Sequence, residues 1–171
     1  LGIANANGFF GLNGPYFQDN DGDGVYEPDP DSDAIGFQYT DLDLAGAFFT
    51  ETDVTDPAAF FAADVSVVSV GLVGLPGMTA SADDLVMQIN MAMVAADPFA
   101  ATAIDFVTSF PAEAAGADND SDGLTGEPAG LQVETGAAPA YIDFTEMLVH
   151  ASGTFTFNLA DGITLEAAFA I

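Results

Sequence analysis

The chain has 171 residues, half of them hydrophobic, and carries 27 Asp and Glu residues but no Lys or Arg, so its formal net charge is −27 at pH 7. This charge argues against DNA, RNA and anionic membrane surfaces as partners, because each binds through cationic side chains. The lack of Cys excludes disulfides and thiolate metal sites. No apolar run approaches the roughly 20 residues of a transmembrane helix, so we expect no membrane insertion.

Alternation of apolar and polar residues predicts strands along most of the chain. Leu85, Met87, Ile89, Met91 and Met93 alternate with smaller or polar residues, which predicts a strand that buries its Leu/Met side. The segment 65–75 is mainly apolar at both its odd-numbered and its even-numbered positions, which is typical of a central strand covered on both faces. Further strands are expected over residues 36–49, 103–110, 131–135 and 141–150.

The C-terminal segment predicts a β-hairpin, because Asp161-Gly162 separates two alternating runs. Short helical turns are expected over 58–63 and 98–102, each after an Asp-Pro pair. No sustained 3.6-residue period occurs, so the predicted fold class is all-β. We expect residues 1–171 to form a single β-rich domain or repeat unit, an antiparallel β-sandwich or β-roll-like module with long acidic loops. A partly open barrel and a β-solenoid remain alternatives.

Two acidic loops, at 18–33 and 117–128, share the pattern D-N-D-x-D-G in one register, 99 positions apart. Ca²⁺ takes six to eight oxygen ligands, and this pattern places three carboxylates on a tight turn that is followed by a backbone carbonyl. Magnesium fits less well because it demands strict octahedral geometry. The predicted calcium ligands are the carboxylates of Asp19, Asp21, Asp23, Glu27, Asp29, Asp31, Asp118, Asp120, Asp122 and Glu127, and the carbonyls of Val25 and Leu124.

The loops differ from an EF-hand, whose closing glutamate occupies loop position twelve, because Pro30 and Ala129 stand there. They resemble the shorter calcium loops of dockerins and thrombospondin type 3 repeats. Closure would then come from Glu27, Asp29 or Asp31 in the first loop and from Glu127 in the second. The first loop has more spare carboxylates and is expected to bind more strongly. The alternative, solvated acidic turns, is disfavoured because two matching loops occur in a chain with no basic side chain to neutralise them.

No catalytic pattern is recognisable, so the chain is not expected to be an enzyme. His150 is the single histidine, at the end of an apolar run, and is interpreted as a strand-edge residue rather than a general base. There is no Gly-x-Ser-x-Gly elbow, no Cys nucleophile and no cation to stabilise an oxyanion. Glu51, Asp53 and Asp56 are read as a solvated turn, with a further cation site as the alternative.

Three glycine-rich segments, 8–11, 67–77 and 151–155, together with the acidic loops resemble a tandem repeat unit of giant secreted calcium-binding bacterial surface proteins, similar to adhesins exported by one-step secretion. The resemblance implies an extracellular, cell-surface module that builds a fibre, filament or adhesin stalk. Its partners would be neighbouring copies of itself, with surface glycans as a further class of partner. Because the chain begins at Leu1 and ends at Ile171 inside an alternating run, we expect its ends to continue into a longer polypeptide or to complete a neighbour's sheet.

Two other functions remain open from the sequence. The first is a calcium-dependent carbohydrate-binding module, with its metal at an exposed cleft beside Tyr16, Phe17 or Tyr26. The second is a secreted or halophilic hydrolase, although acidic residues are so abundant that no particular carboxylate pair stands out.

Overall fold

The computed structural model describes residues 1–29, 31–52, 57–93, 102–159 and 162–171. Its regular structure is nearly all β, which confirms the predicted fold class. The elements are β1 (Gly2–Leu12), β2 (Phe17–Gln18), β3 (Glu27–Pro28), β4 (Ile35–Thr50), β5 (Ala59–Val73), β6 (Met78–Met93), α1 (Phe106–Ser109), β7 (Leu131–Val133), β8 (Ala140–Ile142), β9 (Leu148–Leu159) and β10 (Ile163–Ala170). No helix in these ranges has the length and apolar character needed to cross a membrane.

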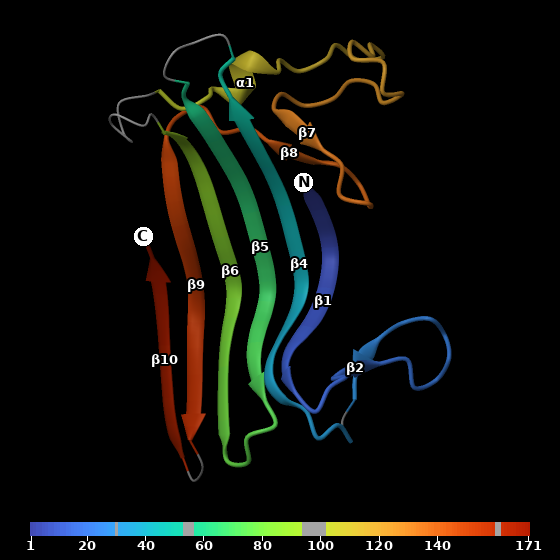
Figure 1. Ribbon diagram of the computed structural model, residues 1–171, viewed down its shortest axis with the longest axis vertical. Coiled ribbons are helices and arrows are strands. Elements are labelled where there is room, and N and C mark those ends of the chain that lie inside the picture. Colours follow the sequence, from blue (N-terminus) through green and yellow to red (C-terminus); the bar gives the residue numbers. More distant parts are fainter. Residues whose placement is uncertain (30, 53–56, 94–101, 160–161) are drawn as a thin grey trace. The chain divides into compact units, whose positions relative to one another are not determined.

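Six strands form one antiparallel sheet in the order β1-β4-β5-β6-β9-β10, as Figure 1 shows. β2 pairs with β3, and β7 with β8, in two separate two-stranded ribbons. The strand predicted over 65–75 lies inside the sheet as part of β5, between β4 and β6. The expectation that both of its faces are covered is wrong, since Val68 is 54% exposed. The predicted C-terminal hairpin is confirmed, since β9 and β10 pair from Leu159↔Ile163 to Ser152↔Ala170. Asp161 of its turn lies outside the described residues.

Three local predictions are wrong. The helical turn expected over 58–63 is the start of β5, because pairing with neighbouring strands overrides the helix propensity of alanine. The strand expected over 103–110 contains α1, which begins where the Asp105 carboxylate accepts a hydrogen bond from Thr108 N. The strand expected over 141–150 is divided between β8 and β9. The turn expected over 98–102 falls, except for its last residue, outside the described part.

The chain divides into two compact units, each built from several segments. Unit 1 comprises Leu1–Ala4, Leu44–Val65 and Met87–His150, and unit 2 comprises Asn5–Asp43, Ser66–Val86 and Ala151–Ile171. Three residues inside the strands have left-handed backbone conformation: Asn5, Asp41 and Asp84, with φ near 50°. Each lies within two residues of an end of one of the segments that make up unit 2. Asn and Asp tolerate this conformation best, and it is typical of strand bulges.

Side chains satisfy the backbone at two of these left-handed residues. The backbone N–H of Asn5 donates to Asp43 Oδ1 at 2.8 Å, and that of Asp41 donates to Asn7 Oδ1 at 3.0 Å. A bulge takes a backbone group out of the strand ladder, and a lost hydrogen bond is costly unless another partner replaces it. The two side-chain acceptors therefore stabilise the irregular part of the β1–β4 pair.

The hydrophobic core of unit 1 lies between the sheet and the segment that carries α1, β7 and β8. Its buried members are Ala45, Ala62, Phe106, Val133, Ile142 and Phe144. Phe106 fills the centre, with its ring 6.1 Å from that of Phe110 and 6.3 Å from that of Phe49. The sheet contributes alanines to this contact, so the helical turn and the β7–β8 ribbon approach the strands closely.

In β6 the buried side is the opposite of the one predicted. Asn90 and Ala92 are each only 1% exposed, whereas Met87 and Met93 are 43% and 40% exposed. The strand itself is confirmed, but the core of unit 1 covers its small and polar side chains. Alternation in the sequence predicts two faces, and in this sheet the face with the larger apolar side chains is the more open one.

Asn90 provides the first testable prediction. Its side-chain amide donates to the backbone oxygens of Ile104 (2.8 Å) and Glu146 (2.9 Å), and so joins β6 to two connecting segments. Asn90→Leu should lower the free energy of unfolding by about 2–3 kcal/mol, because the buried side chain loses both hydrogen bonds and both carbonyls lose their donor. Urea denaturation measures this change. Asn158→Leu, which removes two exposed bonds, to Thr79 and from Thr164, is the control and should cost less than about 1 kcal/mol.

Candidate metal sites in the two acidic loops

Each acidic loop is closed at its base by backbone hydrogen bonding between its two ends. In the first, Gln18 of β2 pairs with Glu27 of β3, which brackets residues 19–26. In the second, Gly126 N donates to Ala117 O at 3.0 Å, which brackets residues 118–125. The two closures occur at equivalent positions of the repeated pattern, so the two loops have the same length, although the base is a strand pair in the first loop and a backbone hydrogen bond in the second.

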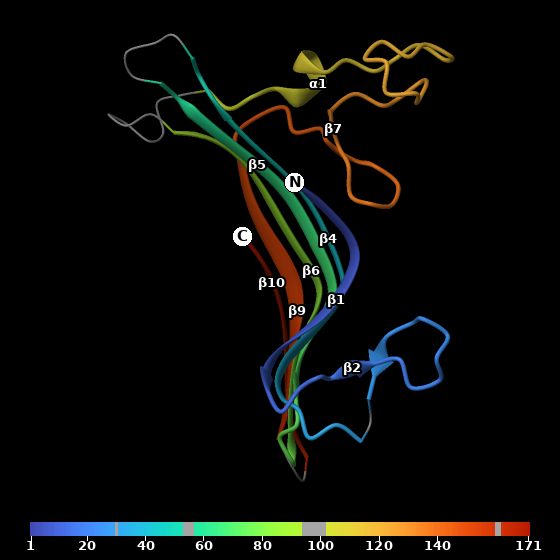
Figure 2. The same cartoon turned by 45° about the vertical axis from the view of Figure 1, so that its right-hand side comes forward.

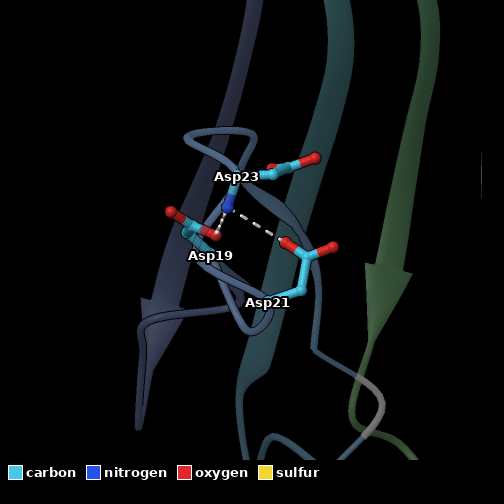
Figure 3. Close-up of side chains that lie close together, drawn as sticks. All are labelled: Asp19, Asp21 and Asp23. Carbon is cyan, nitrogen blue, oxygen red and sulfur yellow. Dashed lines mark hydrogen bonds between the residues drawn. The ribbon is translucent and has the colours of Figure 1, made fainter.

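The hydrogen bonds inside the two loops also correspond. The first aspartate of each loop accepts backbone N–H bonds with both of its oxygens. Asp19 accepts them from Gly22 and Gly24. Asp118 accepts them from Ser121 and Gly123. The second aspartate, Asp21 or Asp120, accepts one N–H at 3.3 Å from the residue two positions on. The third, Asp23 or Asp122, accepts the N–H of Val25 or Leu124. Backbone N–H groups therefore orient all three aspartates of each loop, and Figure 3 shows the N–H of Asp23 between oxygens of Asp19 and Asp21 in the first loop.

The turns depend on left-handed backbone at two places in each loop. Gly22 and Gly24 have φ of 78° and 88°, and Ser121 and Gly123 have φ of 67° and 96°. Glycine adopts this conformation without strain, whereas serine does not. The second loop therefore carries a strained residue where the first has glycine.

Among the residues that the structure describes, three groups of carboxylates are close enough to hold a cation. In each, ligand oxygens lie within 4.8 Å of one another: Asp19, Asp21 and Asp23 in the first loop; Asp118, Asp120 and Asp122 in the second; and Glu113, Asp120 and Glu127 beside the second. The second loop thus gathers five carboxylates that share Asp120, and the first gathers three. This distribution is the reverse of the expectation that the first loop has the richer site.

The remaining predicted ligands of the first loop lie outside its group of three. Glu27 is exposed and belongs to β3. Asp29 Oδ2 accepts a bond from Gln18 Nε2 at 2.6 Å, and Asp29 Oδ1 accepts the N–H of Asp31 at 3.0 Å. In the described arrangement Asp29 therefore ties the two sides of the ribbon base together. Val25 and Leu124 follow the turns at equivalent positions, as the repeated pattern predicts.

Glu113 was missed by sequence reasoning. Its carboxylate accepts the backbone N–H of Asn119 and, at 3.2 Å, that of Gly126, while its own N–H donates to Glu127 O at 2.9 Å. It lies before the Asp motif in the chain, whereas calcium-loop patterns are counted forward from the first aspartate. The backbone hydrogen bonds at the base of the loop bring it back to the site.

A cleft of about 380 Å³ adjoins the second loop. Glu113, Asp120 and Glu127 line it together with Phe110 and Tyr141. The Tyr141 hydroxyl donates to Glu127 Oε1 at 2.6 Å, and this bond to an ionised acceptor, aided by burial, raises the pKa of Tyr141 to about 12. The aromatic and acidic groups therefore meet in one depression.

The predicted association of a metal cleft with Tyr16, Phe17 or Tyr26 does not match these contacts. The Tyr16 ring packs 5.8 Å from Phe9 and 5.1 Å from Phe17, at the base of the β2–β3 ribbon. Tyr26 is 64% exposed in the loop. The aromatic residues that accompany the described carboxylate cleft belong to the second loop instead.

Among the described residues, the carboxylates of the loops are stabilised by hydrogen bonds from uncharged donors. Bonds from the backbone N–H of Leu124 and from the Gln132 side chain lower the pKa of Asp122, which keeps it ionised. With no Lys or Arg in the chain, no side chain other than a protonated His150 offers a positive charge. Amide dipoles orient the carboxylates but leave their net charge in place, which is the situation that favours a bound divalent cation.

Comparison with protein-family models finds no match to this chain, and comparisons with curated proteins and with solved structures likewise find no similar sequence or structure. The site is therefore interpreted from its own residues.

The strain at Ser121 can be tested by exchange between the loops. Ser121→Gly should raise the free energy of unfolding by about 1 kcal/mol, because glycine adopts the left-handed conformation freely. Gly22→Ser is the matched reverse change and should lower it by a similar amount. Denaturant titrations in excess calcium measure both, and a loss of stability in Ser121→Gly would contradict the assigned conformation.

Proposed function

We propose that this chain is a calcium-stabilised extracellular structural module that builds a cell-surface fibre, filament or adhesin stalk. The observation that supports this most directly is the repeated closed loop, in which three aspartates are oriented by the same N–H bonds at two places. Two such loops in a chain without any Lys or Arg need an external cation to offset their charge.

The loops suit a hard cation because their donors are oxygens held in place beforehand. Backbone N–H groups fix one oxygen of Asp21 and one of Asp23, and the described contacts leave the other oxygen of each for a metal. Asp120 is arranged in the same way in the second loop. The carbonyls of Val25 and Leu124 and additional waters would complete the six to eight ligands of Ca²⁺.

Calcium would act on this module through linked folding. Without metal, repulsion among the carboxylates opposes compaction. A site that binds only in the folded state adds RT ln(1 + [L]/Kd), which is about 2.7 kcal/mol at a hundredfold excess of ligand. Extracellular modules bind calcium with Kd of about 10⁻⁴ to 10⁻³ M, which suits folding outside the cell. The module then serves a structural, non-enzymatic role, with neighbouring copies of itself as partners.

Thermal unfolding tests the linkage. With two sites occupied, calcium in excess should raise Tm by roughly 10 °C or more relative to chelator. Asp21→Asn combined with Asp120→Asn should remove most of this increase. Asp41→Asn combined with Asp84→Asn changes the net charge equally at strand residues outside the loops and should retain it. An identical Tm in calcium and chelator for the unmodified chain would refute the proposal.

A second function, calcium-dependent carbohydrate binding, is favoured by the cleft in which Glu113, Asp120 and Glu127 adjoin Phe110 and Tyr141. An aromatic face beside a metal can stack on a sugar ring while the metal binds its hydroxyls. Glycan-array binding should then require calcium and be lost in Tyr141→Ala. Glycan binding that survives chelation of calcium, or no binding on the array, would refute this second function, and only the structural role would remain.

A further inference from the structure

The sheet of unit 2 has one polar and one apolar face, and the β9–β10 hairpin shows the division clearly. Directly paired residues of an antiparallel hairpin point to the same side. On one side Phe157 pairs with Leu165 and Phe155 with Ala167. On the other side Thr156 pairs with Glu166, and all the neighbouring pairs on that side consist of Ser, Thr, Asn or Ala.

Side-chain contacts extend the polar face to β6, β5 and β4. Asn158 donates to Thr79 Oγ1 at 3.1 Å. Ser69 donates to Asp83 Oδ1 at 2.7 Å, and Gly71 lies beneath the side chain of Gln38. Because side chains alternate along a strand, the residues between these belong to the apolar face.

The apolar face includes β1 and β4 at the other side of the sheet. Tyr39 and Phe37 alternate with Gln38, and the Tyr39 ring lies over Gly8, which places Phe10 on the same face as Gly8. At the hairpin end, Gly153 lies beneath Leu85 and Phe169. Within unit 2, this face therefore extends from β1 to β10.

Large side chains on this face are open to solvent. Six of them, each between 38% and 83% exposed, are Phe10, Phe37, Val68, Phe155, Leu165 and Phe169. These six residues together expose roughly 600 Å² of accessible surface. With Leu159 and Ile163, which lie on the same face, the exposed area comes close to the roughly 800 Å² that each partner buries in a standard interface. Among the described residues, Ala34 is the one fully buried hydrophobic residue of unit 2, so the face has no covering layer of its own.

The strand segments that form the apolar face carry few carboxylates, although the net charge of the chain is −27. Within these segments the carboxylates are Asp83 and Glu166, and both lie on the polar face. Asp41 and Asp84, which have left-handed backbone, border the face. The acidic β2–β3 ribbon is attached through Tyr16 to Phe9, which alternates with Phe10 and so points away from the apolar face. Figure 2 shows β2 standing off one side of the sheet. The strand segments that form the apolar face are 8–12, 35–40, 66–73, 78–83, 151–159 and 163–170.

We propose that this apolar face packs against the same face of a second copy of the chain, so that two sheets form a sandwich. A charged partner would gain no ion pair on a face without charges. A second copy presents an equally large uncharged face, and the acidic ribbons of both copies would stay on the outside, where repulsion is weakest. The apolar face would then be the contact surface between neighbouring copies in the proposed assembly. This inference rests on the proposed assembly of copies and does not depend on calcium binding.

Thiol labelling of the full chain tests the surface, because the natural sequence has no Cys. Ala167→Cys places a thiol on the apolar face, and Ala168→Cys places one on the polar face of the same strand. Both alanines are exposed within one copy. As protein concentration rises, labelling at position 167 should slow by about tenfold or more while position 168 keeps its rate. Equal rates at all concentrations would overturn the proposal.

Sedimentation equilibrium gives an independent measure of the association. The unmodified chain should have the mass of two copies, Leu165→Gln combined with Phe37→Gln should have the mass of one, and Glu166→Gln should still pair. Circular dichroism shows whether each variant keeps its β structure. A monomeric unmodified chain, whether or not it binds phosphatidylcholine vesicles, would contradict the proposal.

The same runs in calcium and in chelator separate the two proposals. Pairing through the apolar face with no effect of calcium on Tm would refute the metal proposal alone. A calcium-dependent Tm in a strictly monomeric chain would refute the face-to-face pairing alone.

Discussion

The constraint on which this structure depends is that 27 carboxylates have no lysine or arginine to pair with. The described acidic groups are stabilised by neutral donors: backbone N–H groups in the loops, the Tyr141 hydroxyl at Glu127, and the side chains of Gln18 and Gln132 at Asp29 and Asp122. Such donors orient a carboxylate and keep it ionised, but the charge remains. Both acidic loops therefore gather oriented negative oxygens, and the proposed divalent cation would complete them.

The same constraint shapes where the apolar residues lie. Buried carboxylates without cations are costly, and many of the acidic residues lie in loops, while Asp83 and Glu166 lie on the polar face of the sheet in unit 2. In unit 1 the core is built from alanines of the sheet and from Phe106, Val133, Ile142 and Phe144. The larger apolar side chains of unit 2 are collected on an uncharged face, which provides area for association without adding charge to the contact.

Much of the fold follows from the sequence alone. Alternation at 154–171 predicts the β9–β10 hairpin, and the doubly apolar run at 65–75 predicts an interior strand. The burial of Asn90 rather than Met91 could not be predicted, because alternation defines two faces but tertiary packing decides which one is covered. For the site, the spacing of the aspartates predicts their clustering, whereas Glu113 reaches the second loop only through the pairing of its base.

The central claim is that oriented carboxylates in the two loops bind calcium. Isothermal titration of calcium into the metal-free chain tests it directly, with Asp21→Asn, Asp120→Asn and the double variant titrated alongside. The account predicts saturable binding with at least one ion per loop, partial loss in each single variant and nearly complete loss in the double variant. The absence of saturable binding at millimolar calcium, or full binding in the double variant, would contradict it.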